Sequence, residues 1–193
     1  MKNDLSSSKE QESFCQILSE DQFSEWTCIN DTIMGGNSQA GCEVTSEGLV
    51  FVGNLVEEGG GFVSCCSPQI DPALDLSSFR GLRIILDGDG RNMKFAVACG
   101  ANTFVFPEFF TGGVKWISEF PTRESDSTTV DIFFDSLKPT IRAKKVRVPL
   151  RFDSSKIIQF QLLHSKFGNP GQLNSRFRPG PIRLLLRSIS GIL

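Results

Sequence analysis

Short runs of β-branched and aromatic residues, each bounded by turn residues, are the feature of this 193-residue sequence that most constrains its fold. Apolar and polar side chains alternate cleanly in residues 130–133 and 158–162, as in half-buried strands, and helical periodicity of any length is missing. Many short strands without long helices favour an all-β fold, a β-sandwich with jelly-roll wrapping. The predicted strands are residues 49–52, 62–65, 82–86, 93–97, 116–117, 128–134, 157–163 and 182–189.

The chain is long enough to bury one core, since 39% of its residues are hydrophobic. Residues 1–22 are polar and charged, so we expect a flexible N-terminal tail that ends in a short amphipathic helical turn around Phe14 and Leu18. Residues 23–193 then form the domain. No apolar run approaches the ~20 residues that span a bilayer, and the N-terminus lacks the apolar core of a secretory signal. We therefore expect a cytoplasmic protein that can lie at a membrane surface.

The segment Asp87-Gly-Asp-Gly-Arg91 predicts a tight turn. Aspartate and glycine in this pattern are typical of a hairpin, here between the strands 82–86 and 93–97. Alternate carboxylates also fit a calcium loop, but the full EF-hand spacing is absent, so the hairpin is favoured. Arg91 would pair with Asp89 or Asp87 at the surface, where such a pair contributes only ~0.2 to 1 kcal/mol.

Charge is distributed unevenly along the chain. Residues 1–137 carry 21 acidic and 8 basic side chains, a net charge of −13, and residues 138–193 carry 12 basic and 1 acidic, a net charge of +11. Acidic and basic strands that lie side by side would neutralise each other. Alternatively, the basic segment forms a face for an anionic membrane surface, RNA or an acidic protein. The basic candidates for such a contact are Arg142, Lys144, Lys145 and Arg147.

The stretch from Trp26 to Ser38 contains an aromatic residue, an Asn-Asp pair and two glycines, and no catalytic motif. Asn and Asp side chains bond to nearby backbone amides, and glycines adopt positive φ, so the stretch predicts a shaped turn. Met34 has two interpretations. A flexible thioether fills gaps in a core, or it contacts a partner adaptively from a loop tip.

Neither metal nor covalent chemistry is indicated by the reactive residues. The six cysteines contain no Cys-x-x-Cys spacing, and we expect reduced thiols. Cys65 and Cys66 would point to opposite faces of one strand and be buried separately. His164, the single histidine, has no acid or nucleophile near it in sequence. We expect no catalytic residues, no metal and no cofactor.

Four blocks of sequence, in order, resemble the complex I intermediate-associated protein 30 family. Residues 30–38, Asn-Asp-Thr-Ile-Met-Gly-Gly-Asn-Ser, are similar to the family's Asn-Asp-x-Val-Met-Gly-Gly-x-Ser. Residues 79–83 with 88–91 resemble its Tyr-x-Gly-Leu and Gly-Asp-Gly-Arg block, and residues 139–142 its Pro-Thr-x-Arg run. Residues 180–184 resemble its Gly-Pro-Phe-x-Leu ending. The resemblance covers residues 26–189, and the lack of a presequence leads us to expect a bacterial member, such as a cyanobacterial one.

The resemblance implies a galactose-binding-like β-sandwich whose relatives help to assemble respiratory complex I by holding incomplete intermediates. Related modules in photosynthetic organisms are tied to photosystem biogenesis. We therefore expect a non-enzymatic, chaperone-like assembly factor that binds protein subunits of such an intermediate. An RNA-binding regulator and a carbohydrate-binding or small-ligand module are the alternatives. The partner-binding candidates are Met34 and the four basic residues above. The residues expected to shape the family's turns are Trp26, Asn30, Asp31, Gly35, Gly36, Ser38, Gly81, Gly88, Asp89, Gly90 and Arg91.

Overall fold

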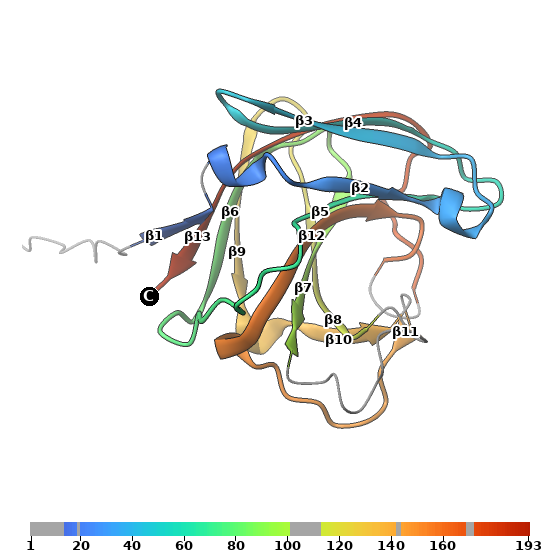
Figure 1. Cartoon of the computed structure of the whole chain (residues 1–193). Helices are drawn as coiled ribbons and strands as arrows, with labels where there is room; N and C mark the ends of the chain where they lie inside the picture. Colours follow the sequence, from blue (N-terminus) through green and yellow to red (C-terminus); the bar gives the residue numbers. More distant parts are fainter. Residues whose placement is uncertain (1–13, 19, 101–112, 142–143, 169–171) are drawn as a thin grey trace, which may run out of the picture.

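The computed structural model describes residues 14–18, 20–100, 113–141, 144–168 and 172–193, which form two facing antiparallel β-sheets (Figure 1). The six-stranded sheet has the order β3 (Gln39–Thr45), β4 (Gly48–Leu55), β13 (Gly180–Ile192), β6 (Gly81–Asp87) and β9 (Ser127–Phe133), with β1 (Phe14–Leu18) also paired to β13. The seven-stranded sheet has the order β11 (Lys144–Lys145), β10 (Lys138–Ile141), β8 (Lys115–Pro121), β7 (Asn92–Cys99), β12 (Ile157–Ser165), β5 (Phe62–Cys66) and β2 (Thr27–Asn30). Short 3-10 helices connect some of the strands: η1 (Glu20–Phe23), η2 (Asp31–Met34), η4 (Phe134–Ser136) and η5 (Ser154–Lys156). The all-β sandwich predicted from the sequence is confirmed.

The hydrophobic core lies between the two sheets. Alternate residues of the predicted strands supply it, and Phe95 of β7 stacks on Phe160 of β12 with 5.7 Å between ring centroids. Each fully buried apolar side chain contributes roughly 1.5–3 kcal/mol. The largest fully buried side chains are Phe23, Phe51, Phe95, Phe160, Leu49, Leu55, Leu76, Leu82, Ile84, Leu86, Met93 and Ile132.

The N-terminal part of the sandwich differs from the prediction. Phe14–Leu18 forms β1 instead of a helical turn, with Phe14 opposite Ile192 and Leu18 opposite Ile189 of β13, and Leu18 is buried. A strand at a sheet edge gains backbone hydrogen bonds that a single helical turn lacks. Strand pairing therefore begins before residue 23, the expected start of the domain.

The predicted hairpin at residues 87–90 is wrong. β6 pairs with β13 and β9, whereas β7 pairs with β12 and β8, so the segment carries the chain from one sheet to the other. Arg91 pairs with Asp89 as expected, but it is only 4% exposed. Its guanidinium also donates to the carbonyls of Arg178 at 3.1 Å and Pro181 at 3.0 Å. Arg91 thus joins the crossover to the segment that leads into β13, which no local turn signal could indicate.

Within the described ranges, no helix is long and apolar enough to cross a membrane.

Candidate binding surface

A buried carboxylate organises the turn that follows β2. Asp31, at the start of η2, is 0% exposed. Its Oδ1 accepts the backbone N–H of Ser38 at 2.8 Å, and its Oδ2 accepts the Ser38 hydroxyl at 2.6 Å. Oδ2 also accepts the backbone N–H groups of Gly61 at 2.6 Å and Phe62 at 3.3 Å. Residues 30–38 and 59–62 therefore form one unit, which we call the Asp31 turn.

Glycines allow the two chain segments to close around this carboxylate. A Cβ at Gly36 or Gly60 would collide with the Asp31 side chain. Gly35 ends η2 with φ +86 and donates its N–H to the carbonyl of Thr32, so it supplies the left-handed conformation instead. Gly36 and Gly60, 24 residues apart in sequence, are thus both required by the side chain of Asp31.

The charge of Asp31 is stabilised in place. Burial alone would raise the pKa of this carboxyl, but the hydrogen bonds from Ser38, Gly61 and Phe62 outweigh burial and hold its pKa below the usual value. The ionised form is therefore the one that holds the turn together. Asn30 plays a different part from the expected capping of backbone amides, because its Nδ2 donates to the carbonyl of Ala40 at 3.3 Å on β3.

The Asp31 turn presents two large apolar side chains to solvent. Ile33 is 71% exposed and Met34 is 68% exposed, and both lie on η2, which projects beyond the end of β2 (Figure 1). The core interpretation of Met34 is thereby excluded. Ile33 was not among the predicted contacts, although its place beside Met34 on a short turn is a usable signal.

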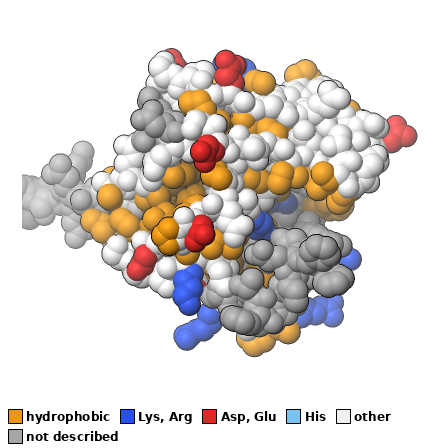
Figure 2. Space-filling view, viewed as in Figure 1, with side chains coloured by type: hydrophobic (Ala, Val, Ile, Leu, Met, Phe, Trp, Pro, Cys, Tyr) orange, Lys and Arg blue, Asp and Glu red, His pale blue; other side chains and the backbone are white. Residues whose placement is uncertain are grey.

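The predicted basic contact lies at the other edge of the same sheet. Lys144 and Lys145 form β11 and are exposed, as is Arg147, while Arg142 falls outside the described residues. None of the three exposed side chains makes an ion pair with another residue in the described ranges. Figure 2 shows Lys and Arg side chains mainly in its lower half, the side on which Figure 1 places β10 and β11.

Six interstrand spacings of about 4.8 Å separate β11 from β2, roughly 29 Å along the sheet. The structure therefore does not bring Met34 and the lysines into one small site. Elsewhere the basic segment is neutralised locally, since Arg187 of β13 pairs with Asp87 of β6 at 2.6 Å and lies 3.5 Å from Glu47. Local neutralisation therefore explains the charge of Arg187, whereas Lys144, Lys145 and Arg147 have no ion pair among the described residues.

The outer face of the seven-stranded sheet carries buried polar groups that sequence patterns did not reveal. Lys94 of β7 lies opposite Glu119 of β8 and is only 3% exposed. Burial lowers the pKa of Lys94 to about 8, against the raising effect of Glu119. Asn92 donates to Oε1 of Glu119 at 3.3 Å, and the buried Oε2 has no hydrogen-bond partner among the described residues. A lysine and a carboxylate thus lie opposite each other on neighbouring strands of this face.

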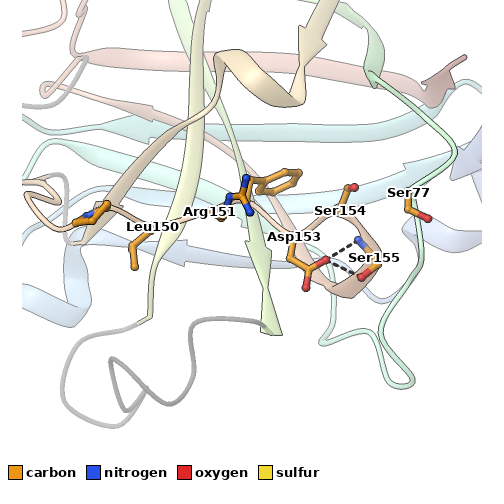
Figure 3. Close-up of a pocket in the computed structure, with 8 residues that line it drawn as sticks. Ser77, Leu150, Arg151, Asp153, Ser154 and Ser155 are labelled. Carbon is orange, nitrogen blue, oxygen red and sulfur yellow. Dashed lines mark hydrogen bonds between the residues drawn. The ribbon is translucent and has the colours of Figure 1, made fainter.

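An open pocket of about 710 Å³ lies beside η5 and is lined by residues 149–155 and Ser77 (Figure 3). Asp153 accepts the hydroxyl of Ser155 at 2.6 Å and its backbone N–H at 3.1 Å. In a Ser-His-Asp triad a histidine lies between the serine and the acid and takes the proton of the serine hydroxyl. His164 cannot serve, because it is 0% exposed and its Nδ1 lies 2.8 Å from the carbonyl oxygen of Asn92.

The two facing antiparallel sheets define the class of protein: a jelly-roll β-sandwich of the galactose-binding-like type. The sequence profile of the complex I intermediate-associated protein 30 (CIA30) family matches residues 15–186. The chain therefore belongs to that family. No curated protein matches it at a significant level.

Solved structures with a similar fold are carbohydrate-binding modules and an enzyme. The family 11 carbohydrate-binding module of the cellulosomal cellulase Lic26A-Cel5E of Clostridium thermocellum is 13% identical, with a TM-score of 0.63 over 94% of this chain and 95% of that one. The family 11 module from Clostridium thermocellum in complex with a β-1,3-1,4-mixed-linked tetrasaccharide is also 13% identical, with a TM-score of 0.61 over 93% and 95%. The agarase AgWH50C is 8% identical, with a TM-score of 0.58 over 94% of this chain and 25% of the agarase. At these identities the likeness establishes the fold.

Proposed function

We propose that this chain is a non-enzymatic binding protein that holds a partly assembled membrane complex of the respiratory complex I or photosynthetic type. The observation that carries the proposal is the display of Ile33 and Met34 on the Asp31 turn. Four hydrogen bonds to a buried carboxylate fix a turn whose outer side chains, Ile33 and Met34, are 71% and 68% exposed. Membership of the CIA30 family supports the same conclusion.

A rigid apolar pair suits the capture of a protein subunit. Burial of a large apolar side chain stabilises a complex by roughly 1.5–3 kcal/mol. Because the Asp31 turn is already fixed, little conformational entropy is lost when it binds. Methionine adapts its shape to different partners, which suits intermediates that change as subunits are added.

The basic residues at β11 give the partner a second contact. Because β11 lies roughly 29 Å from β2 along the sheet, one partner that contacts both β11 and the Asp31 turn has to extend across the whole seven-stranded sheet. Lysines at an edge strand also prevent unwanted strand pairing, so charge alone does not identify a partner. In our proposal they attract an acidic subunit or the anionic membrane surface beside it, and affinity falls as salt rises.

The test is a photo-crosslinking purification from gently solubilised membranes and soluble extract, with the crosslinker placed at Met34. We expect the crosslinker to capture subunits of one membrane complex, and Ile33→Ser with Met34→Ser to reduce their co-purification at least tenfold. Val52→Thr is the matched control, because Val52 is 41% exposed on β4 of the other sheet. Capture of RNA alone, or equal loss in the control, contradicts the proposal.

A carbohydrate-binding role is the second candidate. It is favoured by Lys94 and Glu119, which lie opposite each other on one sheet face, because sugar hydroxyls both donate and accept hydrogen bonds. The similar fold of the family 11 modules supports it. Titration calorimetry with a β-1,3-1,4-mixed-linked oligosaccharide tests this candidate. Binding heat that is present in the wild type and absent in Glu119→Gln favours a carbohydrate-binding role. The absence of binding heat in the wild type excludes it.

A further inference from the structure

Two cysteines from different sheets lie in direct contact. Sγ of Cys28 on β2 is 2.7 Å from Sγ of Cys42 on β3. β2 is an edge strand of the seven-stranded sheet and β3 an edge strand of the six-stranded sheet. The sulfur atoms therefore meet where the two sheet edges come together, next to the Asp31 turn.

The geometry points to a reversible disulfide between Cys28 and Cys42, a modification site that closes this edge of the sandwich. A disulfide bond is about 2.0 Å long, so the sulfurs need to approach by only about 0.7 Å. Both residues are half-buried, which leaves them within reach of a small oxidant. Cys65, opposite Cys28 on β5, is buried and therefore protected.

The bond forms by exchange with a disulfide oxidant of the glutathione class. One protein thiolate attacks a sulfur of the oxidant, forms a mixed disulfide and releases the first oxidant thiolate. The second protein thiolate then attacks the protein sulfur of that mixed disulfide and releases the second oxidant thiolate. Two cysteine thiols become one disulfide, and their two protons pass to the two released thiolates. The hydrogen bond to Cys42, together with burial, raises the pKa of Cys28, so the exchange is slow at neutral pH.

Such a bond would enclose the whole η2 segment in a covalent loop. The loop runs from residue 28 to residue 42 and includes Ile33 and Met34. Closing it reduces the freedom of the unfolded chain and so stabilises the folded state. The redox state of the surroundings would then set how firmly the two sheets are held beside the Asp31 turn.

Peptide mapping of the full chain, incubated with oxidised glutathione, tests the bond directly. Trypsin is unsuitable, because the sequence has no Lys or Arg between Glu10 and Phe79 and leaves five cysteines in one fragment. Cleavage of the unfolded protein at acidic residues separates the pair, since Asp31 lies between Cys28 and Cys42. We expect these two cysteines in one linked species that a reductant splits. Two free thiols, separate glutathione adducts or a Cys42–Cys65 link overturns the inference.

Thermal unfolding provides the second measurement. We expect oxidation to raise the Tm of the wild type on the order of 5–10 °C, reversibly. Cys42→Ser should abolish this rise, and Cys66→Ser should keep it, because Cys66 faces away from the pair on β5. An unchanged Tm in oxidised wild type contradicts the inference. If the serine variants fail to fold, the mapping of the wild type decides by itself.

Discussion

Asp31 and Ser38 are joined by two hydrogen bonds, one from the backbone N–H at 2.8 Å and one from the hydroxyl at 2.6 Å. The Ser38 hydroxyl oxygen also accepts the backbone N–H of Val56 at 2.9 Å, just beyond β4. Gly61 and Phe62 donate their backbone N–H groups to Oδ2, the oxygen that also accepts the Ser38 hydroxyl. The carboxylate, together with Ser38, thus connects η2, the start of β3, the end of β4 and the start of β5. One side chain fixes four segments of the chain around the exposed apolar pair.

Asp31→Asn should lower the free energy of unfolding at pH 7 by about 2–4 kcal/mol. The amide removes the negative charge and turns one acceptor into a donor that faces N–H groups. Because the folded pKa of Asp31 is lowered, its stabilisation is present above its ordinary pKa and is lost as pH falls through the folded value. Urea unfolding at pH 7 and pH 3 measures both effects. A variant that retains the full acid sensitivity of the wild type contradicts this assignment.

Gly60→Ala should destabilise the protein more than Gly35→Ala. At Gly60 the new Cβ collides with the Asp31 carboxylate, and we expect a loss of about 2–3 kcal/mol. At Gly35 nothing lies within 4 Å, so only the strain of φ +86 remains, about 1 kcal/mol. The urea concentrations at the unfolding midpoints of the two variants show which substitution destabilises the protein more. A larger loss at Gly35 would mean that backbone strain, and not the packing around the carboxylate, limits the Asp31 turn.

His164→Gln should remove most of the pH dependence of stability between pH 6.5 and pH 4. Burial lowers the pKa of His164 to about 4, so the unfolded chain binds a proton in this range and the folded protein does not. Stability is complete above pH 6.5 and falls by about 3 kcal/mol as pH drops to 4. His164 is the single histidine in the sequence, so no other imidazole contributes to the difference between the variant and the wild type. Parallel stability curves for variant and wild type would show that folding leaves the pKa of His164 near its ordinary value.

Reversal of charge at β11 should weaken partner binding without unfolding the protein. Lys144→Glu with Lys145→Glu keeps a charged edge strand, so we expect a stability change within about 0.5 kcal/mol. Affinity for the captured subunits should fall about tenfold at low salt and little at high salt. Lys156→Glu, on η5 near Asp153, serves as the control for charge alone. Equal loss at both salt concentrations argues against electrostatic attraction.

The long central strands could be predicted because their own side chains carry the pattern. Residues 157–163 and 182–189 alternate or remain apolar, and they form most of β12 and β13. β2, β10 and β11 were missed, since strands of two to four residues at or near a sheet edge are too short for a period to emerge. The seven-residue β3 was missed as well, because it is an edge strand with no buried residue and so lacks an apolar face. The turn at residues 87–90 has hairpin composition, but local composition cannot tell which sheet the next strand joins.

Residues of the candidate binding surface could be predicted only where a short sequence motif marked them. Met34 stood out beside paired glycines, whereas the role of Gly60 depends on a carboxylate 29 positions earlier in the chain. The contact between Cys28 and Cys42 likewise arises because two sheet edges meet, and no spacing rule contains that information. Lys94 was overlooked because a lysine in a strand is ordinarily expected to point into water.

β13 lies between β4 and β6 in the six-stranded sheet and pairs with both of them, so β13 connects these two strands. During synthesis, β4 leaves the ribosome more than 120 residues before the last residue of β13 does, at Leu55 compared with Ile192. Until β13 is made, β4 has no paired strand other than β3 within the described residues, and β6 lacks its partner β13. The edges of β4 and β6 therefore remain open to mispairing until β13 has been translated.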